Sequence, residues 1–348
     1  MPVARPTDGI WTAPTEELVG AQLVPGVWMS ALPFPNPLKH IFSYFVETDA
    51  GLVVIDLGWN TEEAWQVFLT GLANAGKSID DVAGVVITHV HPDHYGLAAR
   101  FKEASDAWIA THPAERPQLP LDDHAQAIRL QDMLDWMDRC GAPQEETDRF
   151  RAEFPDVIHT FSRVQPDVDL SDRVPVLGTS GSLVPVHTPG HTPGHMCFLD
   201  RERGVVFTGD HLLPRVTPNV SRRPTSDPDP LTDFTASLGV VDDLEAEGAL
   251  TALPGHEWSF TRLHERLTEI DEHHSERLDE MADAVARGAH TVWEVSQSIT
   301  WKRPFATLDA RARRSALGET YSHLTRLHTL GRLDLVSTDV DRFSPASS

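Results

Sequence analysis

The sequence predicts an α/β fold, because short apolar runs typical of buried strands alternate with amphipathic helical segments. Three of these runs occupy residues 41–46, 51–56 and 84–87, and the last is rich in β-branched residues. Between the last two, residues 61–75 place apolar side chains on one helical face, and a second helix is expected at 97–104. The order strand, helix, strand, helix is the alternation of an α/β protein.

The rest of the chain continues this alternation. Further strands are expected at 26–29, 107–110, 183–187, 196–199, 204–208 and 249–253, and further helices at 231–247 and 261–287. The turns of two hairpins are expected near 48–50 and 200–203. The loop at 33–37 contains three prolines, which exclude a helix there.

The composition is that of an ordinary globular protein, with 40% hydrophobic and 23% charged residues among 348. The net charge of −23 argues against a general binder of nucleic acid or anionic membranes, because a protein that binds either partner needs a basic surface. Cys140 and Cys197 cannot form a disulfide framework. No stretch reaches the length of a membrane span, and the N-terminus lacks the apolar run of a signal peptide. We therefore expect a cytoplasmic protein.

The stretch 88–96 concentrates metal-binding side chains in one turn after a strand. His89 and His91 are two residues apart, so in an extended segment their side chains point the same way. A proline then ends the regular strand, and Asp93 and His94 follow in the turn. Such a segment can offer ligands to one metal ion and to a neighbouring one. Imidazole and carboxylate groups suit Zn, Fe or Mn.

The sequence Thr-His-Val-His-Pro-Asp-His at 88–94 resembles the signature of the metallo-β-lactamase fold hydrolases, a family that includes glyoxalase II. The chain also resembles the three later motifs of that family. These matches are Thr-Pro-Gly-His ending at His191, Thr-Gly-Asp ending at Asp210 and Pro-Gly-His ending at His256. The resemblance covers about residues 20–265 and implies the αββα sandwich of this fold.

The resemblance also implies a binuclear metal centre. The first metal would be bound by His89, His91, His191 and Asp210, and the second by Asp93, His94, His256 and Asp210, whose carboxylate bridges the two. The implied cofactors are two Zn²⁺ ions, with Fe or Mn as alternatives. Every ligand position carries the residue type of the family, so no departure suggests an inactive enzyme.

Four other polar residues lie close to these motifs. Asp56 belongs to an Asp-x-Gly at a strand end, which in the family often lies near the metal site; otherwise it is a turn residue. His195 and Tyr95 are the candidates for contacting a substrate carbonyl, although Tyr95 can instead face the core. We expect that His211, adjacent to a ligand, is not itself a ligand.

We divide the chain into a lead-in at 1–20, a metallo-β-lactamase fold domain at 21–265 and a C-terminal module at 266–348. An insertion at about 113–169, with helices at 123–139 and 144–154, separates the first two motifs. We expect it to form a lid or wall of the active site, the alternative being a peripheral helical hairpin.

The C-terminal module is expected to be mostly helical and resembles the winged-helix-like extension of some family members. Arg311, Arg313 and Arg314 give it local basic character. Because the whole chain is acidic, we favour a packing or dimerisation role over nucleic-acid binding. Elsewhere, Arg215, Arg222 and Arg223 could contact an anionic substrate group, but solvated surface charges are the favoured interpretation.

The expected function follows from the ligand set and the resemblance. A hydroxide that bridges two metal ions would attack the acyl carbon of a thioester, lactone or related ester, with Asp93 orienting it and Asp210 bridging the ions. Two other reactions of the fold stay open: a phosphodiesterase or ribonuclease, and a sulfur dioxygenase with a single iron. We expect a small-molecule substrate, no nucleic acid, no membrane partner, and a homodimer as the assembly.

Overall fold

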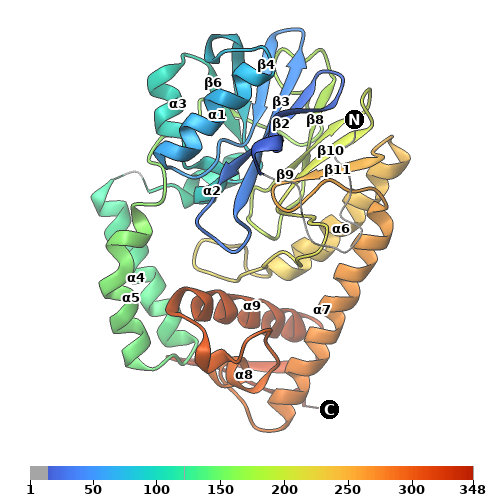
Figure 1. Ribbon diagram of the computed structural model, residues 1–348. Coiled ribbons are helices and arrows are strands. Elements are labelled where there is room, and N and C mark those ends of the chain that lie inside the picture. Colours follow the sequence, from blue (N-terminus) through green and yellow to red (C-terminus); the bar gives the residue numbers. More distant parts are fainter. Residues whose placement is uncertain (1–14, 121, 348) are drawn as a thin grey trace.

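Two β-sheets pack face to face in the upper part of the molecule (Figure 1). The computed structural model describes residues 15–120 and 122–347. The first sheet contains, in spatial order, β1 (Val19–Val24), β2 (Val27–Pro33), β3 (His40–Thr48), β4 (Gly51–Ile55), β5 (Val82–Val86), β6 (Trp108–Thr111) and β7 (Val168–Asp169). The second contains β11 (Thr251–Pro254), β10 (Val205–Gly209), β9 (Met196–Asp200) and β8 (Leu183–His187).

Strand direction changes once within each sheet. Strands β1 to β4 are antiparallel and β4 to β7 are parallel. In the second sheet, β8 to β10 are antiparallel and β10 and β11 are parallel. Because the carboxyl ends of parallel strands lie at the same edge of a sheet, the loops after β4, β5 and β6 meet, as do those after β10 and β11. The loops after β5, β10 and β11 carry six of the seven predicted ligands, and His191 lies in the connection between β8 and β9.

Helices cover the outer faces of both sheets. Helices α1 (Glu62–Asn74) and α3 (Ala98–Ala104) pack on the first sheet, and α6 (Pro230–Ala246) and α7 (Leu263–Ala286) pack on the second. The hydroxyl of Thr61 caps α1 by accepting the N–H of Ala64, as predicted. The predicted αββα sandwich is therefore confirmed.

An apolar layer between the sheets holds the sandwich together. Phe42, Phe198 and Phe207 are fully buried in it, together with valine, leucine and methionine side chains of both sheets. The hydroxyl of Tyr44 on β3 donates a hydrogen bond of 2.6 Å to the carbonyl of Pro254 on β11. This bond ties the two sheets together beside the loop that carries His256.

The helical insertion and the C-terminal region share one further apolar core. It contains side chains of α4 (Asp123–Arg139), α5 (Gln144–Ile158), α8 (Val292–Ser298), α9 (Ala310–Thr329) and the hairpin of β12 (Leu333–Ser337) and β13 (Asp341–Pro345). In Figure 1 these elements lie below the sandwich, with α4 and α5 on one side and α7 on the other. Helices α8 and α9 are followed by the hairpin of β12 and β13, and the winged-helix-like character of this module stays a prediction.

The predicted borders between the parts stay a prediction. Leu263, Leu267 and Ile270 of α7 belong to the core under the second sheet, whereas Met281 and Val285 of the same helix belong to the lower core. One helix therefore joins the two parts across the predicted border at 265. Strand β1 begins inside the predicted lead-in, and residues 1–14 lie outside the described residues.

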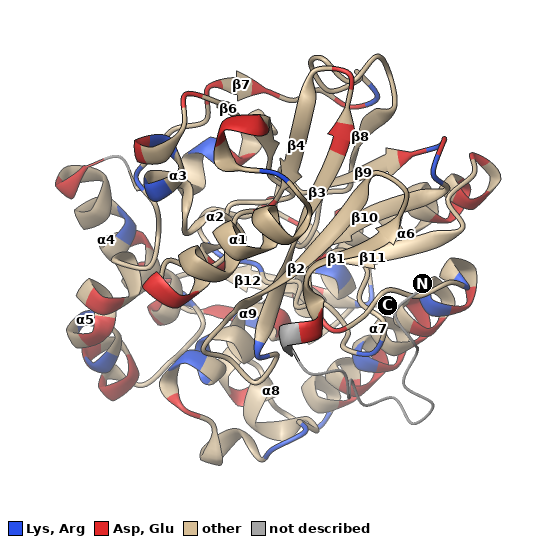
Figure 2. Cartoon of the chain, turned by 45° about the horizontal axis from the view of Figure 1, so that its top comes forward, with Lys and Arg blue, Asp and Glu red and all other residues tan. Residues whose placement is uncertain are grey.

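Charged residues lie mainly on the helices and loops, while the strands of both sheets carry few of them (Figure 2). This follows from burial, because both faces of each sheet are covered. Helix α5 ends four residues later than expected, at Ile158, since Phe154 and Ile158 both pack into the lower core. Within residues 15–120 and 122–347, no helix has the length and apolarity needed to cross a membrane.

Replacing Leu253 by alanine should reduce the free energy of unfolding by about 2–5 kcal/mol, because its side chain is 2% exposed between the sheets. Denaturant unfolding monitored by circular dichroism measures this change. Leu250→Ala is the matched control: that side chain, three residues earlier, is 64% exposed, so its loss should change stability by about 0.5 kcal/mol or less. Equal effects of the two substitutions would contradict this packing.

Candidate metal centre

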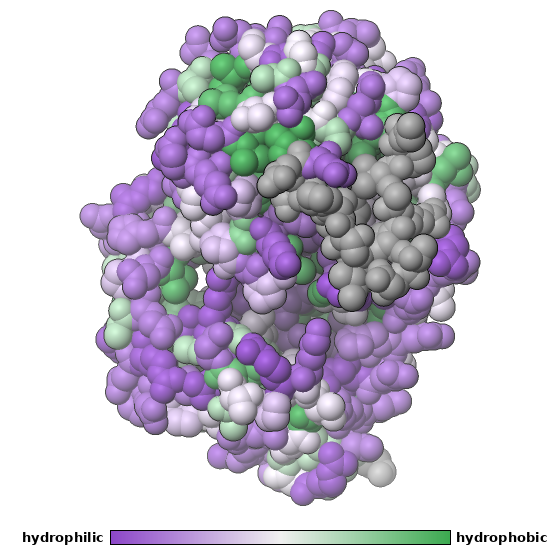
Figure 3. Space-filling view, in the orientation of Figure 1, coloured by the Kyte–Doolittle hydropathy of each residue, from purple (hydrophilic) through white to green (hydrophobic). Residues whose placement is uncertain are grey.

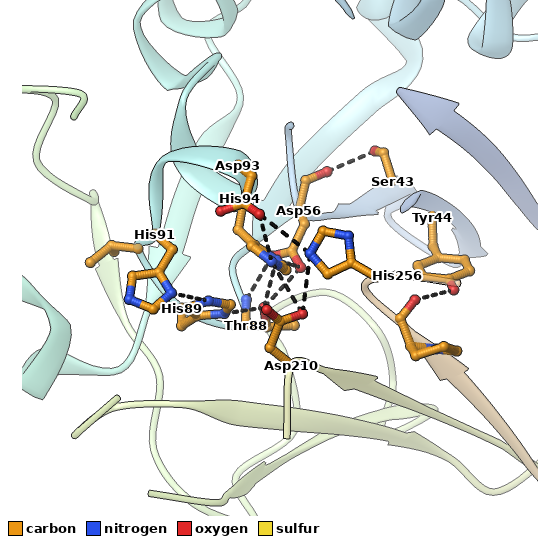
Figure 4. A network of polar contacts seen from close by, with 12 residues as sticks. Ser43, Tyr44, Asp56, Thr88, His89, His91, Asp93, His94, Asp210 and His256 are labelled. Atoms are coloured by element: carbon orange, nitrogen blue, oxygen red, sulfur yellow. Dashed lines mark hydrogen bonds and ion pairs between the residues drawn. The ribbon is translucent and has the colours of Figure 1, made fainter. Parts of the chain in front are cut away.

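The seven predicted ligands meet at one edge of the sandwich. Those of the first motif follow β5 and lie around the single helical turn α2 (Pro92–Tyr95). His191 lies in the connection between β8 and β9, Asp210 directly after β10, and His256 two residues after β11. Figure 4 shows the side chains of Asp93, Asp210 and His256 pointing toward one another from three separate elements.

Three imidazoles form the first group of the centre. Nε2 of His89 lies 2.9 Å from Nδ1 of His91, and Nε2 of His191 lies 3.1 Å from that same atom. Oδ2 of Asp210 lies 3.8 Å from Nε2 of His191. Nitrogen ligands of one tetrahedral zinc lie about 3.3 Å apart, since each is about 2.0–2.1 Å from the metal. The spacing of these imidazoles is close to that of ligands around a shared ion.

Asp93, His94 and His256 form the second group, together with the other oxygen of Asp210. Nε2 of His256 lies 3.3 Å from Oδ2 of Asp93 and 3.5 Å from Oδ1 of Asp210. Nε2 of His94 lies 3.4 Å from Oδ1 of Asp210. The two oxygens of Asp210 thus face different groups, which is the arrangement of a bridging carboxylate.

Two atoms of the second group are buried without a hydrogen-bond partner among the described residues. They are Nε2 of His94 and Oδ1 of Asp210. An unsatisfied buried polar group costs about 1–3 kcal/mol, and a cation bound to both atoms would remove that cost. Gly255 leaves the room they need, since a Cβ there would lie 2.8 Å from Oδ1 of Asp210 and from Cε1 of His94. The residues present therefore fit two metal ions.

Burial and charge set the protonation of the ligands. Burial lowers the pKa of His91 to about 3, and it also lowers the pKa values of His89 and His191. These imidazoles are consequently neutral, which is the form that binds a metal. Burial opposes the charge of His94 and His256 as well, but nearby carboxylates outweigh it and raise both pKa values. The same carboxylates would attract a metal cation to these two histidines.

Asp56 fixes the first motif from the end of β4, close to the metal site as the resemblance implies. Its Oδ1 accepts the N–H of Thr88, and its Oδ2 accepts the Thr88 hydroxyl, both at 2.8 Å. Oδ2 also accepts Nδ1–H of His94 at 2.7 Å. The φ of Asp56 is 61°, a left-handed conformation that costs about 1–2 kcal/mol in residues other than glycine. These bonds offset that cost and aim Nε2 of His94 at the second group.

Backbone carbonyls orient two other ligands in the same way. Nδ1–H of His256 donates to the carbonyl of His40 at 2.8 Å, and Nδ1–H of His191 donates to the carbonyl of Asn219 at 2.8 Å. A hydrogen bond on one ring nitrogen fixes the tautomer and the ring plane, so that the other nitrogen faces the metal. Neither carbonyl could be inferred from sequence, because a backbone carbonyl has no residue signature.

Glu115 is a residue of the centre that the sequence motifs did not indicate. It follows β6 and is fully buried. Its Oε2 accepts the N–H of Val90 at 2.8 Å, and its Oε1 accepts the N–H of Gly194 at 2.7 Å. One carboxylate thus joins the loop of the first motif to the loop that carries His191. A single glutamate after a strand belongs to no motif, so its sequence position does not distinguish it from a surface residue.

His195 and Tyr95, the candidates for contacting a carbonyl, do not line the cavity. Nε2 of His195 accepts the backbone N–H of Asp210 at 3.2 Å, and Nδ1–H donates to the hydroxyl of Thr188 at 2.8 Å. Tyr95 packs into the apolar core beneath α1, and its hydroxyl donates to the carbonyl of Val164 at 3.2 Å. His195 therefore positions Asp210, and Tyr95 faces the core, because the last residue of the single turn α2 points away from the ligands.

The other charged candidates have distinct environments. His211 belongs to none of the groups of metal ligands and packs against Phe234, with ring centroids 4.8 Å apart. Arg215 pairs with Glu257 at 2.7 Å. Arg222 and Arg223 are half-buried, contrary to the favoured interpretation as solvated surface charges. The guanidinium of Arg222 lies over the ring of Tyr321, whereas Arg223 lines the cavity described next.

A cavity of about 630 Å³ opens above the ligands, and its floor includes His91, Asp93, His191, Asp210 and His256. Phe34, Leu38 and Trp59 form one apolar wall. The insertion forms the opposite wall with Leu119, Ile128, Met133, Phe150, Phe154, Val157, Ile158 and Phe161. Figure 3 shows this face of the molecule hollowed between the sandwich and the helices below it. The insertion is therefore a wall of the site, as predicted.

Comparisons with known proteins agree with this geometry. A family model described as "Metallo-beta-lactamase superfamily" matches residues 37–256. The probable metallo-hydrolase YqjP of Bacillus subtilis (strain 168) is 24% identical over 322 residues, which cover 88% of this chain and 91% of that protein. The acyl-coenzyme A thioesterase MBLAC2 of Homo sapiens is 27% identical over 168 residues, which cover 45% of this chain and 53% of that protein.

A solved structure is similar over nearly the whole chain. The metallo-beta-lactamase family protein TTHA1429 from Thermus thermophilus is 28% identical and superposes with a TM-score of 0.73, covering 92% of this chain and 99% of that one. The similarity therefore includes the helical parts below the sandwich. Since the family match spans more than half of the chain and contains all the predicted ligands, the chain belongs to the metallo-β-lactamase superfamily and is a metallo-hydrolase.

Proposed function

We propose that this metallo-hydrolase cleaves acyl thioesters or related esters at a centre of two zinc ions. The observation that carries the proposal is an apolar cavity whose floor is made of two groups of metal ligands that share Asp210. A cavity lined mainly by apolar and aromatic side chains suits an acyl chain, with a few polar groups to orient the reacting bond. Neither cysteine lines it, so no thiol is available there as a nucleophile.

Zinc is the proposed metal because five of the seven candidate ligands are imidazoles. Imidazole nitrogen suits zinc, although iron accepts the same ligands. When bound, the two ions would lower the pKa of a water molecule and polarise the carbonyl of the substrate. Each group offers ligands close enough to hold one ion, and Asp210 would belong to both.

The residues of the chain hold and orient what reacts. Asp93 lies at the cavity floor, where its carboxylate can accept a hydrogen bond from the attacking water and aim it at the carbonyl carbon. His195 holds the backbone of Asp210 in place. The aromatic wall of Phe34 and Trp59, whose rings are 5.3 Å apart, excludes bulk water from one side.

The relatives support an acyl substrate over the alternatives. MBLAC2 is an acyl-coenzyme A thioesterase by name, and the alignment spans about half of its length, so we take from it the substrate class alone. A phosphodiesterase acting on nucleic acid would need a basic approach surface, and the net charge of the chain is −23. A sulfur dioxygenase with one iron would leave the second group of ligands without a role.

Purified protein loaded with zinc should hydrolyse acyl thioesters, and His91→Ala and Asp210→Ala should each abolish this turnover and reduce bound metal. The reason is that His91 belongs to the first group and Asp210 to both. Turnover is followed by release of the free thiol, and bound metal by elemental analysis. His264→Ala is the control, because that side chain is 69% exposed on α7 and pairs with Asp242.

Three results would argue against the proposal. Full activity in either ligand variant would mean that the site is assigned wrongly. Turnover of a bis-phosphodiester in place of thioesters and lactones would favour a phosphodiesterase. A single bound iron with sulfur dioxygenation and no acyl hydrolysis would favour the third reaction.

Glu115→Gln should weaken metal binding or activity by about 10–100-fold, the usual effect of removing a partner that orients metal ligands. Glutamine has the same shape but only one accepting oxygen, so either Val90 or Gly194 loses its hydrogen-bond acceptor. Competition with a chromophoric chelator measures the metal affinity. Glu103→Gln, at an exposed position on α3, is the matched control. Unchanged affinity in Glu115→Gln would show that the two loops are held by other contacts.

A further inference from the structure

Four arginines line the cavity above the metal centre, although the net charge of the chain is −23. They are Arg129 on α4, Arg223 in the loop before α6, and Arg311 and Arg314 on α9. They come from three separate segments that the fold brings to one cavity. The proposed acyl hydrolysis uses none of them.

Two of the four have partners within the protein. Arg314 pairs with Glu153 at 3.1 Å, and its guanidinium lies 4.7 Å from the centre of the Phe150 ring. Arg129 donates to the backbone carbonyl of Gln118 and lies over the ring of Phe161. These contacts fix both side chains as parts of the cavity wall.

The other two guanidinium groups have no hydrogen bond or ion pair within the described part of the chain. They belong to Arg223 and Arg311, and both side chains line the same cavity. Arg223 is half-buried. Burial, together with the nearby charges of Arg314 and Arg311, lowers the pKa of Arg223 to about 10. A half-buried cation beside two further cations, with no carboxylate of its own, is a site that an external anion would stabilise.

The position of Arg223 connects this cationic corner to the metal centre. Arg223 also borders a smaller polar recess of about 60 Å³, which His91 and His191 line as well. Asn219, Ser221, Thr225 and Ser226 supply hydroxyl and amide groups around that recess. The large cavity therefore has an apolar wall from α4 and α5 and a floor of candidate metal ligands. Beside that floor lies a cationic corner, formed by Arg223 and Arg311.

We propose that Arg223 and Arg311 form a binding site for the phosphate groups of a phosphorylated thiol, the leaving group of the thioester substrate. This inference rests on the proposed function and specifies its substrate class. These two guanidinium charges, which have no ion pair among the described residues, match a phosphate monoester, which carries a charge of about −1.5 to −2 at pH 7. The apolar wall takes the acyl chain, and the cationic corner takes the thiol portion.

The cationic corner also provides local positive charge on a protein whose net charge is −23. An acidic surface repels a polyanionic substrate, and a local cluster of arginines reverses the field where the substrate must enter. Arginine suits this role, because its planar guanidinium can donate two parallel hydrogen bonds to the oxygens of one phosphate.

The test compares two thiols that differ in their phosphate groups. Calorimetric titration of the zinc-loaded protein should show coenzyme A binding at least about tenfold more tightly than pantetheine, which carries the same thiol without phosphate. Arg223→Gln and Arg311→Gln should each reduce this advantage by about tenfold, the loss expected for a charge-assisted hydrogen bond. Arg262→Gln, a 69% exposed arginine at the start of α7, is the control that should retain the advantage.

Equal affinity for the two thiols, or an unchanged advantage of coenzyme A in both arginine variants, would overturn the proposal. So would arginine variants that weaken binding of glutaryl-pantetheine but not of coenzyme A, because the anion would then belong to the acyl part. Hydrolysis is read separately. If the protein binds coenzyme A through these arginines but cleaves no thioester, the phosphate site is supported and the proposed function is wrong. If the protein cleaves pantetheine thioesters but does not bind coenzyme A more tightly than pantetheine, the proposed function is supported and the phosphate site is wrong.

Discussion

The structure depends on bringing seven polar side chains together at one end of an apolar sandwich. The ends of the strands make this possible. Each strand keeps its own side chains in the core and places the residue that follows it at the edge of the sheet. Asp56, the ligands of the first motif, Asp210 and His256 all follow strands in this way. The hydrogen bond from Tyr44 to Pro254 joins the two sheets beside His256.

Buried partners keep the ligands in orientation. An imidazole that is free to rotate would present either nitrogen, so the ligand histidines depend on the Asp56 carboxylate and on the carbonyls of His40 and Asn219. Glu115 adds a connection between two loops that are far apart in sequence. The candidate ligands are thus held in place by neighbours that are not themselves candidate ligands. Two ligand atoms, Nε2 of His94 and Oδ1 of Asp210, have no hydrogen-bond partner among the described residues.

The sandwich could be anticipated from sequence, because strands leave a local pattern of apolar periodicity. The seven candidate ligands could be named from the first motif and from the resemblance to the family, and the structure brings their side chains together. The insertion was also predicted correctly as a cavity wall. What could not be predicted depends on contacts between distant segments. Glu115 and Arg223 have ordinary sequence surroundings, and only the fold places one beneath two loops and the other beside the ligands. Tyr95 shows the opposite case: it follows a ligand directly, yet its side chain packs into the core.

If two metal ions lie on either side of Asp210, anomalous X-ray diffraction from crystals of the zinc-loaded protein will locate both. Data collected on both sides of the zinc absorption edge locate each ion independently of any ligand assignment. We expect two anomalous peaks, one among His89, His91 and His191 and the other among Asp93, His94 and His256. A single peak in the fully loaded protein, or peaks away from the Asp210 carboxylate, would mean that these side chains do not hold a binuclear centre.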